Sequence, residues 1–510
     1  MKAFDDLGSR IAFDSSRNVL VARSPSDIDP HSHKFSKAML PVRNTTLWLS
    51  IEDLLNRSWF ERLWIWQEVC LAKNDISLVC GNIEIGFQTF CNAIRYLFGG
   101  RSGFSGLGQA RLIVSQFSRK GSKNFSQLMY DMRHCKCSDE RDRVYGLLNL
   151  THEHDQLQKL PDYTKSVREV FQALLMRQLR DRRSLDLLML GSLSTASLDI
   201  PTWLNWSVPT EIRGLRSGEA AAGAWAVGHY AGDGILETTG LYVATICQVR
   251  LENGIWSNEV SRSTAREAIE NVLRKVIGSV HIAVARPMIE SLCRSMRFHL
   301  CSEDYFPPRE DQTSFQEAFN SFEECWKSSS IQDPKSAPKW RTEGLLTACK
   351  MMRGRVIITT ANGLTGIGPE DARVGDKICV ILGCANPLVL RPREDQHYQI
   401  VGECCFDGIM EGEALLGPLP SPWRPIKKWY PELKEYYSAY LDPDTGKTQI
   451  EDPRLGSLPK GWSIKSHKDQ DAWSCYINYD TGEDAGSEHP GLRFDALEKR
   501  GVKFEEFRLV

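Results

Sequence analysis

Residues 57–82, RSWFERLWIWQEVCLAKNDISLVCGN, decide the fold prediction for the first part of the chain. Ser58 and Glu61 have the spacing of a capping box and therefore predict the start of a helix. Large apolar residues recur at helical spacing from there until the helix is expected to end near Lys73. Beyond it, two apolar runs flank Gly81-Asn82, which predicts a tight β-hairpin. The apolar stripe of the predicted helix consists of Leu55, Trp59, Leu63, Trp66 and Cys70.

The composition is that of an ordinary globular protein, since 42% of the 510 residues are hydrophobic and 25% are charged. This length allows two or three domains of roughly 100–200 residues each. The net charge of −2 provides no field that would attract nucleic acid or an anionic membrane. The 15 cysteines follow no disulfide framework and, with no apolar signal sequence at the N-terminus, are expected to be reduced thiols. We therefore expect a cytoplasmic protein that has no nucleic-acid or membrane partner.

Patterns downstream divide the chain further. Ser138, followed by Asp139 and Glu140, is expected to cap a short helix, and the apolar stripe of residues 167–182 predicts a longer one. From residue 353 to 416, short strands alternate with turns, as in a small barrel. The predicted segments are a disordered or remnant stretch (1–44), a folded region (45–150), a helical or mixed middle region (151–340), a barrel-like domain (341–418) and a tail (419–510).

Several segments in collinear order resemble the heterokaryon incompatibility (HET) family. Residues 57–82 match the family's Trp-Phe-x-Arg-x-Trp-x-x-Gln-Glu helix with its following strand and Cys-Gly, and CSDERDRVYGLLNL (137–150) matches its Asp-x-Arg-Asp-x-Val-Tyr-x-Leu-Leu segment. PDYTKSVREVF (161–171), IPTWLNWS (200–207) and three strand-rich segments between 354 and 415 also resemble the family, so the resemblance covers about residues 45–418. The motif residues that it assigns are Trp59, Phe60, Arg62, Trp64, Gln67, Glu68, Asp139, Arg141, Asp142 and Tyr145.

The resemblance implies an α+β fold. Its parts would be a truncated α/β remnant of a HET domain, similar to Toll/interleukin-1-receptor (TIR) domains, then a helical middle region and a small β-barrel. The family's opening blocks, of the types Tyr-x-Ala-Leu-Ser-Tyr-x-Trp-Gly and Ile-Asp-x-x-Cys-Ile-Asn-Gln, do not occur in the 510 residues. We therefore expect an N-terminally truncated HET domain, with residues 45–150 as its C-terminal half.

Two groups of motif residues allow more than one interpretation. Glu68 is the candidate catalytic carboxylate, because some relatives of the TIR fold cleave NAD and such chemistry needs a carboxylate near the ribose. The alternative is that Glu68 and Arg62 tie their helix to its neighbours. The charges at residues 139–143 are either a polar network that fixes a helix or a signalling interface.

No metal or cofactor is expected. The cysteine pair Cys404-Cys405 is expected to pack in the core, and the GLTGIG loop (363–368) lies between strands, so no helix N-terminus is available for a phosphate. A cluster of histidines and cysteines has the spacing of no standard zinc site. Its members are His134, Cys135, Cys137, His152 and His154.

The tail contains two segments with a common layout that resemble WW domains, each of roughly 40 residues. The structural residues that the resemblance assigns are Trp423, Tyr440, Pro453, Trp462, Tyr476 and Pro490. The second, ligand-clamping tryptophan is replaced by Ile450 in the first segment and falls near Gly486 in the second. We therefore expect degenerate WW-like units that dock on the barrel, with recognition of proline-rich ligands as the alternative.

The function that the resemblance implies is non-self recognition leading to programmed cell death in filamentous fungi. It would work through association with an incompatibility partner or with a second copy, and the absence of the opening blocks leaves an inactive protein as an open outcome. A TIR-like enzyme that cleaves NAD through Glu68 is one alternative. A non-enzymatic scaffold or the product of a pseudogene is another.

Overall fold

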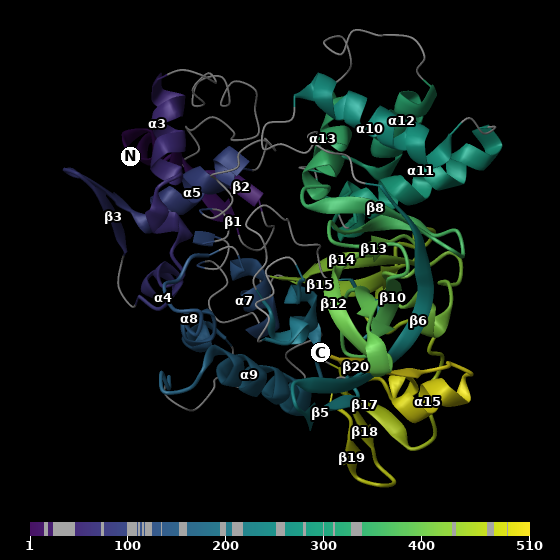
Figure 1. Cartoon of the computed structure of the whole chain (residues 1–510). Coiled ribbons are helices and arrows are strands. Elements are labelled where there is room, and N and C mark those ends of the chain that lie inside the picture. Colours follow the sequence, from purple (N-terminus) through teal and green to yellow (C-terminus); the bar gives the residue numbers. More distant parts are fainter. Residues whose placement is uncertain are drawn as a thin grey trace. The chain divides into compact units, whose positions relative to one another are not determined.

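A computed structural model divides the chain into two compact units (Figure 1). The first unit comprises residues 1–167 and 429–436, and the second comprises residues 168–428 and 437–510. The structure describes residues 1–14, 19–23, 46–72, 76–98, 110, 113–114, 117, 125–133, 135–151, 161–193, 200–206, 218–250, 261–278, 282–298, 300–309, 312–327, 339–430, 435–466, 474–486 and 488–510.

The first unit begins with a helix and a hairpin. α1 (Lys2–Gly8) packs on α5 (Phe87–Phe98), and β1 (Ile11–Asp14) pairs antiparallel with β2 (Val19–Ala22). A Cβ atom at Gly8 would lie 1.9 Å from the carbonyl oxygen of Thr89, so the close approach of α1 to α5 requires a glycine there. Residues 1–44 were predicted as a disordered or remnant stretch; these elements lie within 2–22 of it, while residues 15–18 and 24–45 lie outside the described residues.

The helix predicted after Ser58 is broken in two. Ser58–Glu61 forms a 3₁₀ turn without a side-chain cap, and α4 (Ile65–Cys70) begins only after the extended residue Arg62. Arg62 forms a parallel bridge with Lys136, in which the amide of Leu63 donates to Lys136 O at 3.0 Å and the amide of Lys136 donates to Glu61 O at 2.7 Å. A cap contributes only about 1 kcal/mol, so this long-range pairing decides the local conformation.

The other described elements of the first unit are short. α3 (Thr46–Leu55) precedes the motif, and β3 (Ser77–Cys80) and β4 (Ile83–Gly86) form the hairpin predicted at Gly81-Asn82. α7 (Phe125–Met132) is followed by α8 (Asp142–Tyr145), which begins later than the helix predicted at Ser138 because the Asp139 carboxylate accepts the amide of Arg141 and closes a turn. The strands described in this unit's two hairpin sheets pair antiparallel, so the TIR-like character remains a prediction.

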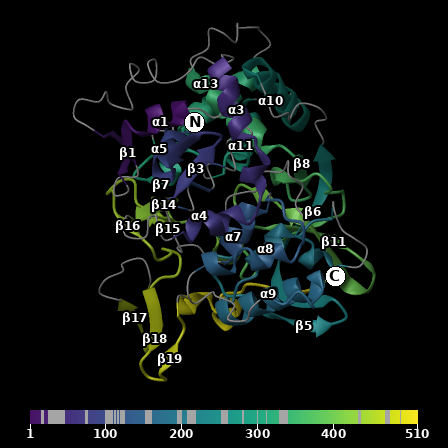
Figure 2. The same ribbon diagram turned by 90° about the vertical axis from the view of Figure 1, so that its left-hand side faces the viewer.

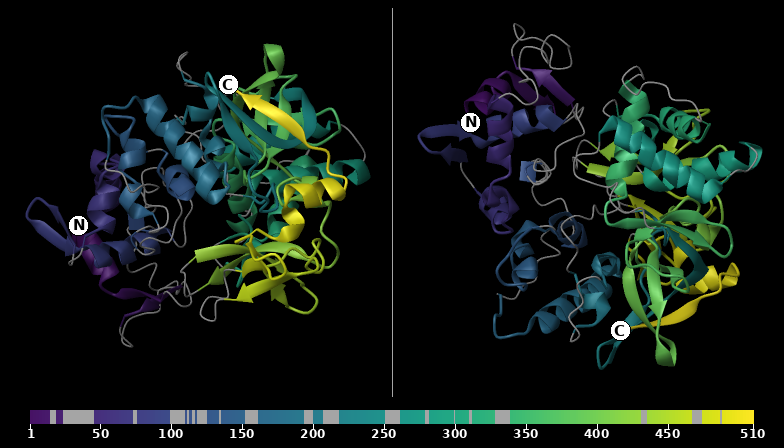
Figure 3. Two further views of the ribbon diagram at one scale, coloured as in Figure 1. Left: turned by 90° about the horizontal axis from the view of Figure 1, so that it is seen from below. Right: turned by 45° about the horizontal axis from the view of Figure 1, so that its top comes forward.

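The second unit is built around a closed barrel. Its five strands are joined in a ring because β10 pairs with both β11 and β6, while the last strand, β20, joins β12 to β6. Figure 3 shows β20 lying along β6. The strands of the ring are β6 (Ile235–Arg250), β10 (Lys377–Ile381), β11 (Leu388–Pro392), β12 (His397–Glu403) and β20 (Glu505–Leu509). The residue range predicted for the barrel, 341–418, is therefore too short, because β6 and β20 come from outside that range.

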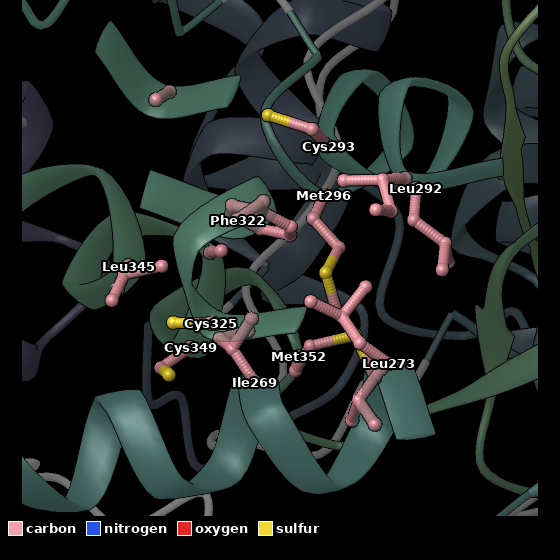
Figure 4. Packing of buried hydrophobic residues seen from close by; sticks show 14 of the residues in the cluster. Ile269, Leu273, Leu292, Cys293, Met296, Phe322, Cys325, Leu345, Cys349 and Met352 are labelled. Atoms are coloured by element: carbon pink, nitrogen blue, oxygen red, sulfur yellow. The ribbon is translucent and has the colours of Figure 1, made fainter. Parts of the chain in front are cut away.

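A helical layer covers the continuation of this sheet. β6 runs on to pair with β8, and β8 pairs with β9, which pairs with β13, while β5 pairs with β6 near its start. α11 packs on β9 and β13, and its inner face meets the other helices around Met296 and Phe322 (Figure 4). The elements of this layer are α10 (Arg262–Ile277), α11 (Ile282–Met296), α12 (Phe315–Lys327), α13 (Lys339–Met351), β5 (Gly228–Gly232), β8 (Arg355–Thr360), β9 (Thr365–Pro369) and β13 (Cys405–Phe406).

The C-terminal region forms two further sheets. Both belong to the second unit, except that residues 429–436, which lie in the earlier of the two sheets along the chain, belong to the first unit. We call residues 420–454 the first repeat and residues 459–490 the second repeat. β7 adds a fourth strand to the sheet of the first repeat, as Figure 2 shows, and the second repeat has three strands. The strands are β7 (Tyr305–Phe306), β14 (Arg424–Tyr430), β15 (Glu435–Leu441), β16 (Thr448–Gln449), β17 (Trp462–Ser466), β18 (Ser474–Asn478) and β19 (Glu483–Asp484).

Helices and sheets occur in both units, so the predicted α+β class is confirmed. α9 (Val167–Arg182) spans the residues predicted for it, and α14 (Glu413–Leu416) and α15 (Phe494–Lys499) are single turns or little more. None of the helices in the described ranges is long and apolar enough to cross a membrane.

Candidate functional site

The HET-motif residues of the first unit connect α4 to α8 through side-chain hydrogen bonds. Trp64 Nε1 donates to Asp142 Oδ2 at 3.1 Å. Gln67 Nε2 donates to the carbonyl oxygens of Tyr145 at 3.3 Å and Gly146 at 2.9 Å. Helices of one or two turns are not stable alone, so these bonds and the burial of the helices hold both in place.

The segment that follows α8 closes this network. Tyr163 donates its hydroxyl hydrogen to Asp142 Oδ1 at 2.7 Å, so each oxygen of this buried carboxylate accepts a hydrogen bond. Tyr145 donates to the carbonyl of Asp162 at 2.8 Å, and its ring meets that of Tyr163 edge to face at 5.1 Å. The bond to Asp142 raises the pKa of Tyr163 to about 12. In the sequence, residues 161–171 stand out only by their resemblance to the family. A hydrogen-bond partner some twenty residues away, such as Asp142 for Tyr163, leaves no local pattern.

Arg141 is the centre of the charges at residues 139–143. It pairs with Asp139 at 2.6 Å and donates to the carbonyl oxygens of Tyr163 at 2.6 Å and Lys165 at 2.9 Å. Its guanidinium also lies 5.2 Å from the centre of the Tyr163 ring. The hydrogen bonds from Arg141 lower the pKa of Asp139. In the structure these charges therefore form a polar network that fixes α8.

Glu68 and Arg62 are placed differently from the other motif residues. Both side chains are exposed, and no described residue forms a side-chain hydrogen bond with either. The side-chain contacts between α4 and its neighbours, which were predicted for Glu68 and Arg62, are made by Trp64 and Gln67 instead. Of the two aromatic residues before them, Phe60 is buried and stacks on Phe90 at 6.0 Å, while Trp59 is half-buried and meets the edge of Phe60.

The structure describes only some of the histidines and cysteines at residues 134–154, for which no zinc site was predicted. His134, His152 and His154 lie outside the described residues, and no three metal-binding side chains cluster among those that the structure does describe. Burial raises the pKa of Cys135 to about 12 and that of Cys137 to about 11, so both are neutral thiols near pH 7. Cys404 and Cys405 are both buried in the second unit, and their burial also raises the pKa of each thiol.

The two repeats of the second unit share their local geometry. Asp442 Oδ1 accepts the amides of the second and third residues after it at 2.9 and 3.3 Å, and Asn478 Oδ1 accepts the corresponding amides at 3.0 and 3.2 Å. The amide of Trp423 donates to the carbonyl of the proline three residues earlier, and the amide of Trp462 does the same. These turns and tryptophans define which positions of the two repeats correspond.

The inner tyrosines of the repeats differ in their partners. Tyr440 donates to Asp452 Oδ2 at 2.8 Å, and Asp452 pairs with Arg454 at 2.6 Å, with each of the paired side chains 4% exposed. In the second repeat, the Tyr476 ring contacts the ring of His489 at 5.1 Å. Pro453 follows Asp452 as the buried Pro490 follows His489. The position of the missing clamp residue is 38% exposed at Ile450, and the WW likeness remains a prediction.

Arg454 also connects the first repeat to the segment that precedes it. Its guanidinium donates to the carbonyl oxygens of Gly417 at 2.7 Å and Glu411 at 2.6 Å. Burial raises the pKa of the Glu411 carboxyl to about 7. Nothing in the sequence indicated that Arg454 would be buried and would connect these segments.

Comparison with known proteins adds two matches. A family model described as the Het-6 beta-barrel domain matches residues 258–417. Heterokaryon incompatibility protein 6, OR allele, from Neurospora crassa is 26% identical over 450 residues, covering 70% of this chain and 65% of the relative. The match thus spans just under two thirds of the relative's length. No solved structure matches.

Proposed function

This chain is a heterokaryon incompatibility (HET) type protein, and from that premise we propose that it acts in the non-self recognition of filamentous fungi by associating with other protein chains in the cytoplasm. Its partner would be an incompatibility protein or a second copy, and the response would be programmed cell death.

The hydrogen bonds that the motif side chains make, and the exposure of Tyr163 beside them, support this proposal. Trp64 donates to Asp142 and Gln67 donates to the backbone, while Asp142 also accepts the hydroxyl hydrogen of Tyr163 and so fixes the segment that bears it. Tyr163 nevertheless remains 48% exposed, with the guanidinium of Arg141 over its ring. Tyrosine and arginine are enriched at protein interfaces, and a ring whose hydroxyl is already bound loses little entropy on binding. The network therefore supports an interface that is held ready for a protein partner.

Variants of Tyr163 test the proposed interface. Tyr163→Ala removes the ring and is expected to weaken association at least about tenfold, while Tyr163→Phe keeps the ring and is expected to retain most of it. The measurement is co-purification of tagged and untagged chains from a fungal host, together with growth of that host on induction. Equal association and equal growth arrest for Tyr163→Ala and the parent protein would contradict the proposal.

NAD cleavage remains a second candidate because of one observation. The Glu68 carboxylate is exposed on α4, and no described residue accepts or donates a hydrogen bond to it. Purified protein mixed with NAD is followed for nicotinamide release, with Glu68→Gln as the matched variant. Turnover that Glu68→Gln abolishes would favour the enzyme, and a host that grows normally on overexpression would favour the scaffold or pseudogene alternative.

A further inference from the structure

The first repeat carries a strand from a distant part of the chain. β7 pairs with β14 in parallel, with Tyr305 opposite Lys427 and Phe306 opposite Lys428. Arg424 Nη1 donates to the carbonyl of Glu303 at 2.7 Å, which fixes the segment before β7. The edge of β14 is therefore occupied by an extended segment of the same chain (Figure 2).

Phe306 of this segment covers one face of the first repeat. It packs on a cluster of three buried residues, Ile426, Ala439 and Leu441. Two prolines, Pro307 and Pro308, follow it. Proline has no amide hydrogen to donate to a sheet, so the pairing ends after the aromatic residue.

The corresponding face of the second repeat is less deeply buried. Leu441 and Ile477 each directly precede the turn residue that the repeats share, and Ala439 and Cys475 lie two positions earlier. Ala439 and Leu441 are 1% and 7% exposed, whereas Cys475 and Ile477 are half-buried. The tyrosines between them, on the opposite face, are buried in both repeats. Along β15 and β18, the difference in burial therefore lies on the face that Phe306 covers in the first repeat.

Within the described residues, the edge strand of the second repeat also lacks the added strand that the first repeat has. β17 lies at the edge of its sheet, and no strand among the described residues pairs with its outer side. Ile464 on this strand is 40% exposed, but it lies opposite Tyr476 and therefore on the other face of the sheet. The β17 residues opposite Ile477 and Cys475 are Ser463 and Lys465. Unpaired amide and carbonyl groups along a strand edge accept an added extended segment.

We propose that the outer edge of β17 and the face formed by Cys475 and Ile477 bind an extended segment of another protein, in which an aromatic residue precedes a proline. The chain's own segment on the first repeat, EDYFPPR (303–309), is the template for this ligand. The aromatic ring would lie over Ile477 as Phe306 lies over the first repeat, while the backbone pairs with β17. The site is in the second unit and does not depend on the HET-motif network.

A labelled peptide of sequence EDYFPPR tests the site on the full chain by fluorescence anisotropy. Saturable binding is expected, and the same peptide with alanine in place of its phenylalanine is expected to bind at least about tenfold more weakly, because an aromatic anchor dominates such interfaces. In the protein, Ile477→Glu is expected to weaken binding as strongly. The control variant Val374→Glu changes a residue that is 66% exposed elsewhere in the second unit and should leave binding unchanged.

Hydrogen exchange locates the bound peptide without any substitution in the protein, so the test stands even if Ile477→Glu disturbs folding. Slower exchange of the β17 amides on addition of peptide is expected. Protection of β14 instead, or no saturable binding at millimolar peptide, would overturn the proposal. Self-association of the protein without peptide that Ile477→Glu abolishes would assign the site to a second copy and would also overturn it.

Discussion

The first and second repeats follow the same local chain path but are stabilised in different ways. In the first repeat, Asp452 and Arg454 form a buried ion pair, and Arg454 continues to the carbonyl groups of Gly417 and Glu411. In the second repeat, the place of the aspartate is taken by His489, which contacts Tyr476 through its ring. The first repeat is also covered by Phe306, and the second has no such cover among the described residues.

This comparison shows that stability in such small sheets depends on what surrounds them. A sheet of two or three short strands cannot bury enough apolar surface to be stable by itself. The shared turns and tryptophans set the path of the chain, whereas the ion pair and the cover decide how firmly a repeat is held. One repeat can therefore be tied to the rest of the second unit while the corresponding face of the other stays less deeply buried.

The largest expected effect comes from breaking the buried ion pair of the first repeat. Arg454→Met leaves the Asp452 carboxylate buried without its cation and removes the donors to Gly417 and Glu411. We expect the free energy of unfolding to fall by about 3–5 kcal/mol, as for other buried pairs that lose one partner. Urea denaturation measures this loss.

An exposed pair supplies the control for Arg454→Met. Lys499 and Asp495 lie 3.5 Å apart, with side chains 80% and 66% exposed, so Lys499→Met should cost less than about 1 kcal/mol. Combining Arg454→Met with Asp452→Asn removes the buried charge and should recover part of the loss. Equal costs for Arg454→Met and Lys499→Met would show that the first repeat is not anchored by its ion pair.

The sequence predicted well those features that depend on neighbouring residues. The hairpin at Gly81-Asn82 and the helix of residues 167–182 are confirmed, because turn chemistry and a helical apolar stripe are local. The strands between 353 and 416 are confirmed for the same reason. The corresponding turns of the two repeats could also be recognised, since Asp442 and Asn478 each bond to the backbone of their own turn.

Features that depend on distant pairing were not visible in the sequence. The barrel requires β20 to enter between β6 and β12, which are separated from it by more than 100 residues of chain. The break at Arg62 is caused by Lys136, and the position of Asp142 is fixed by Trp64 and Tyr163. Such partners are chosen by the packed fold rather than by spacing, so the motif residues could be identified but the bonds between them could not.

The cover over the first repeat predicts unequal costs for two corresponding substitutions. Leu441→Ala removes a side chain that is 7% exposed beneath Phe306 and should lower the free energy of unfolding by about 2–3 kcal/mol. Ile477→Ala removes a half-buried side chain and should cost about 1 kcal/mol or less. Chemical denaturation of both variants measures the difference. Equal costs would mean that the two faces are equally buried in solution, and the comparison between the repeats would fail.

The smallest expected effect depends on pH and concerns Glu488 in the second repeat. Burial raises the pKa of this carboxyl from 4.5 to about 7, although its oxygen accepts the amide of Trp225 at 2.9 Å. A carboxyl with a raised pKa in the folded state destabilises that state when it is charged, so the cost appears as pH rises above 4.5 and is complete above about 7. Glu488→Gln keeps an acceptor for Trp225 and removes the charge. We therefore expect it to stabilise the protein by on the order of 1 kcal/mol at pH 8 and not at pH 4.5.

Thermal melts of the parent protein and Glu488→Gln at both pH values measure this change. Burial lowers the pKa of His489, but this residue is present in both proteins, so its own titration cancels in the difference. Asp452→Asn removes the buried acid of the first repeat and should destabilise at pH 8, because the Asp452 carboxylate is paired with Arg454. If both substitutions changed stability in the same direction at pH 8, a buried acid would have the same role in the two repeats. Opposite signs would show that a paired charge holds the first repeat in place, whereas a desolvated charge weakens the second.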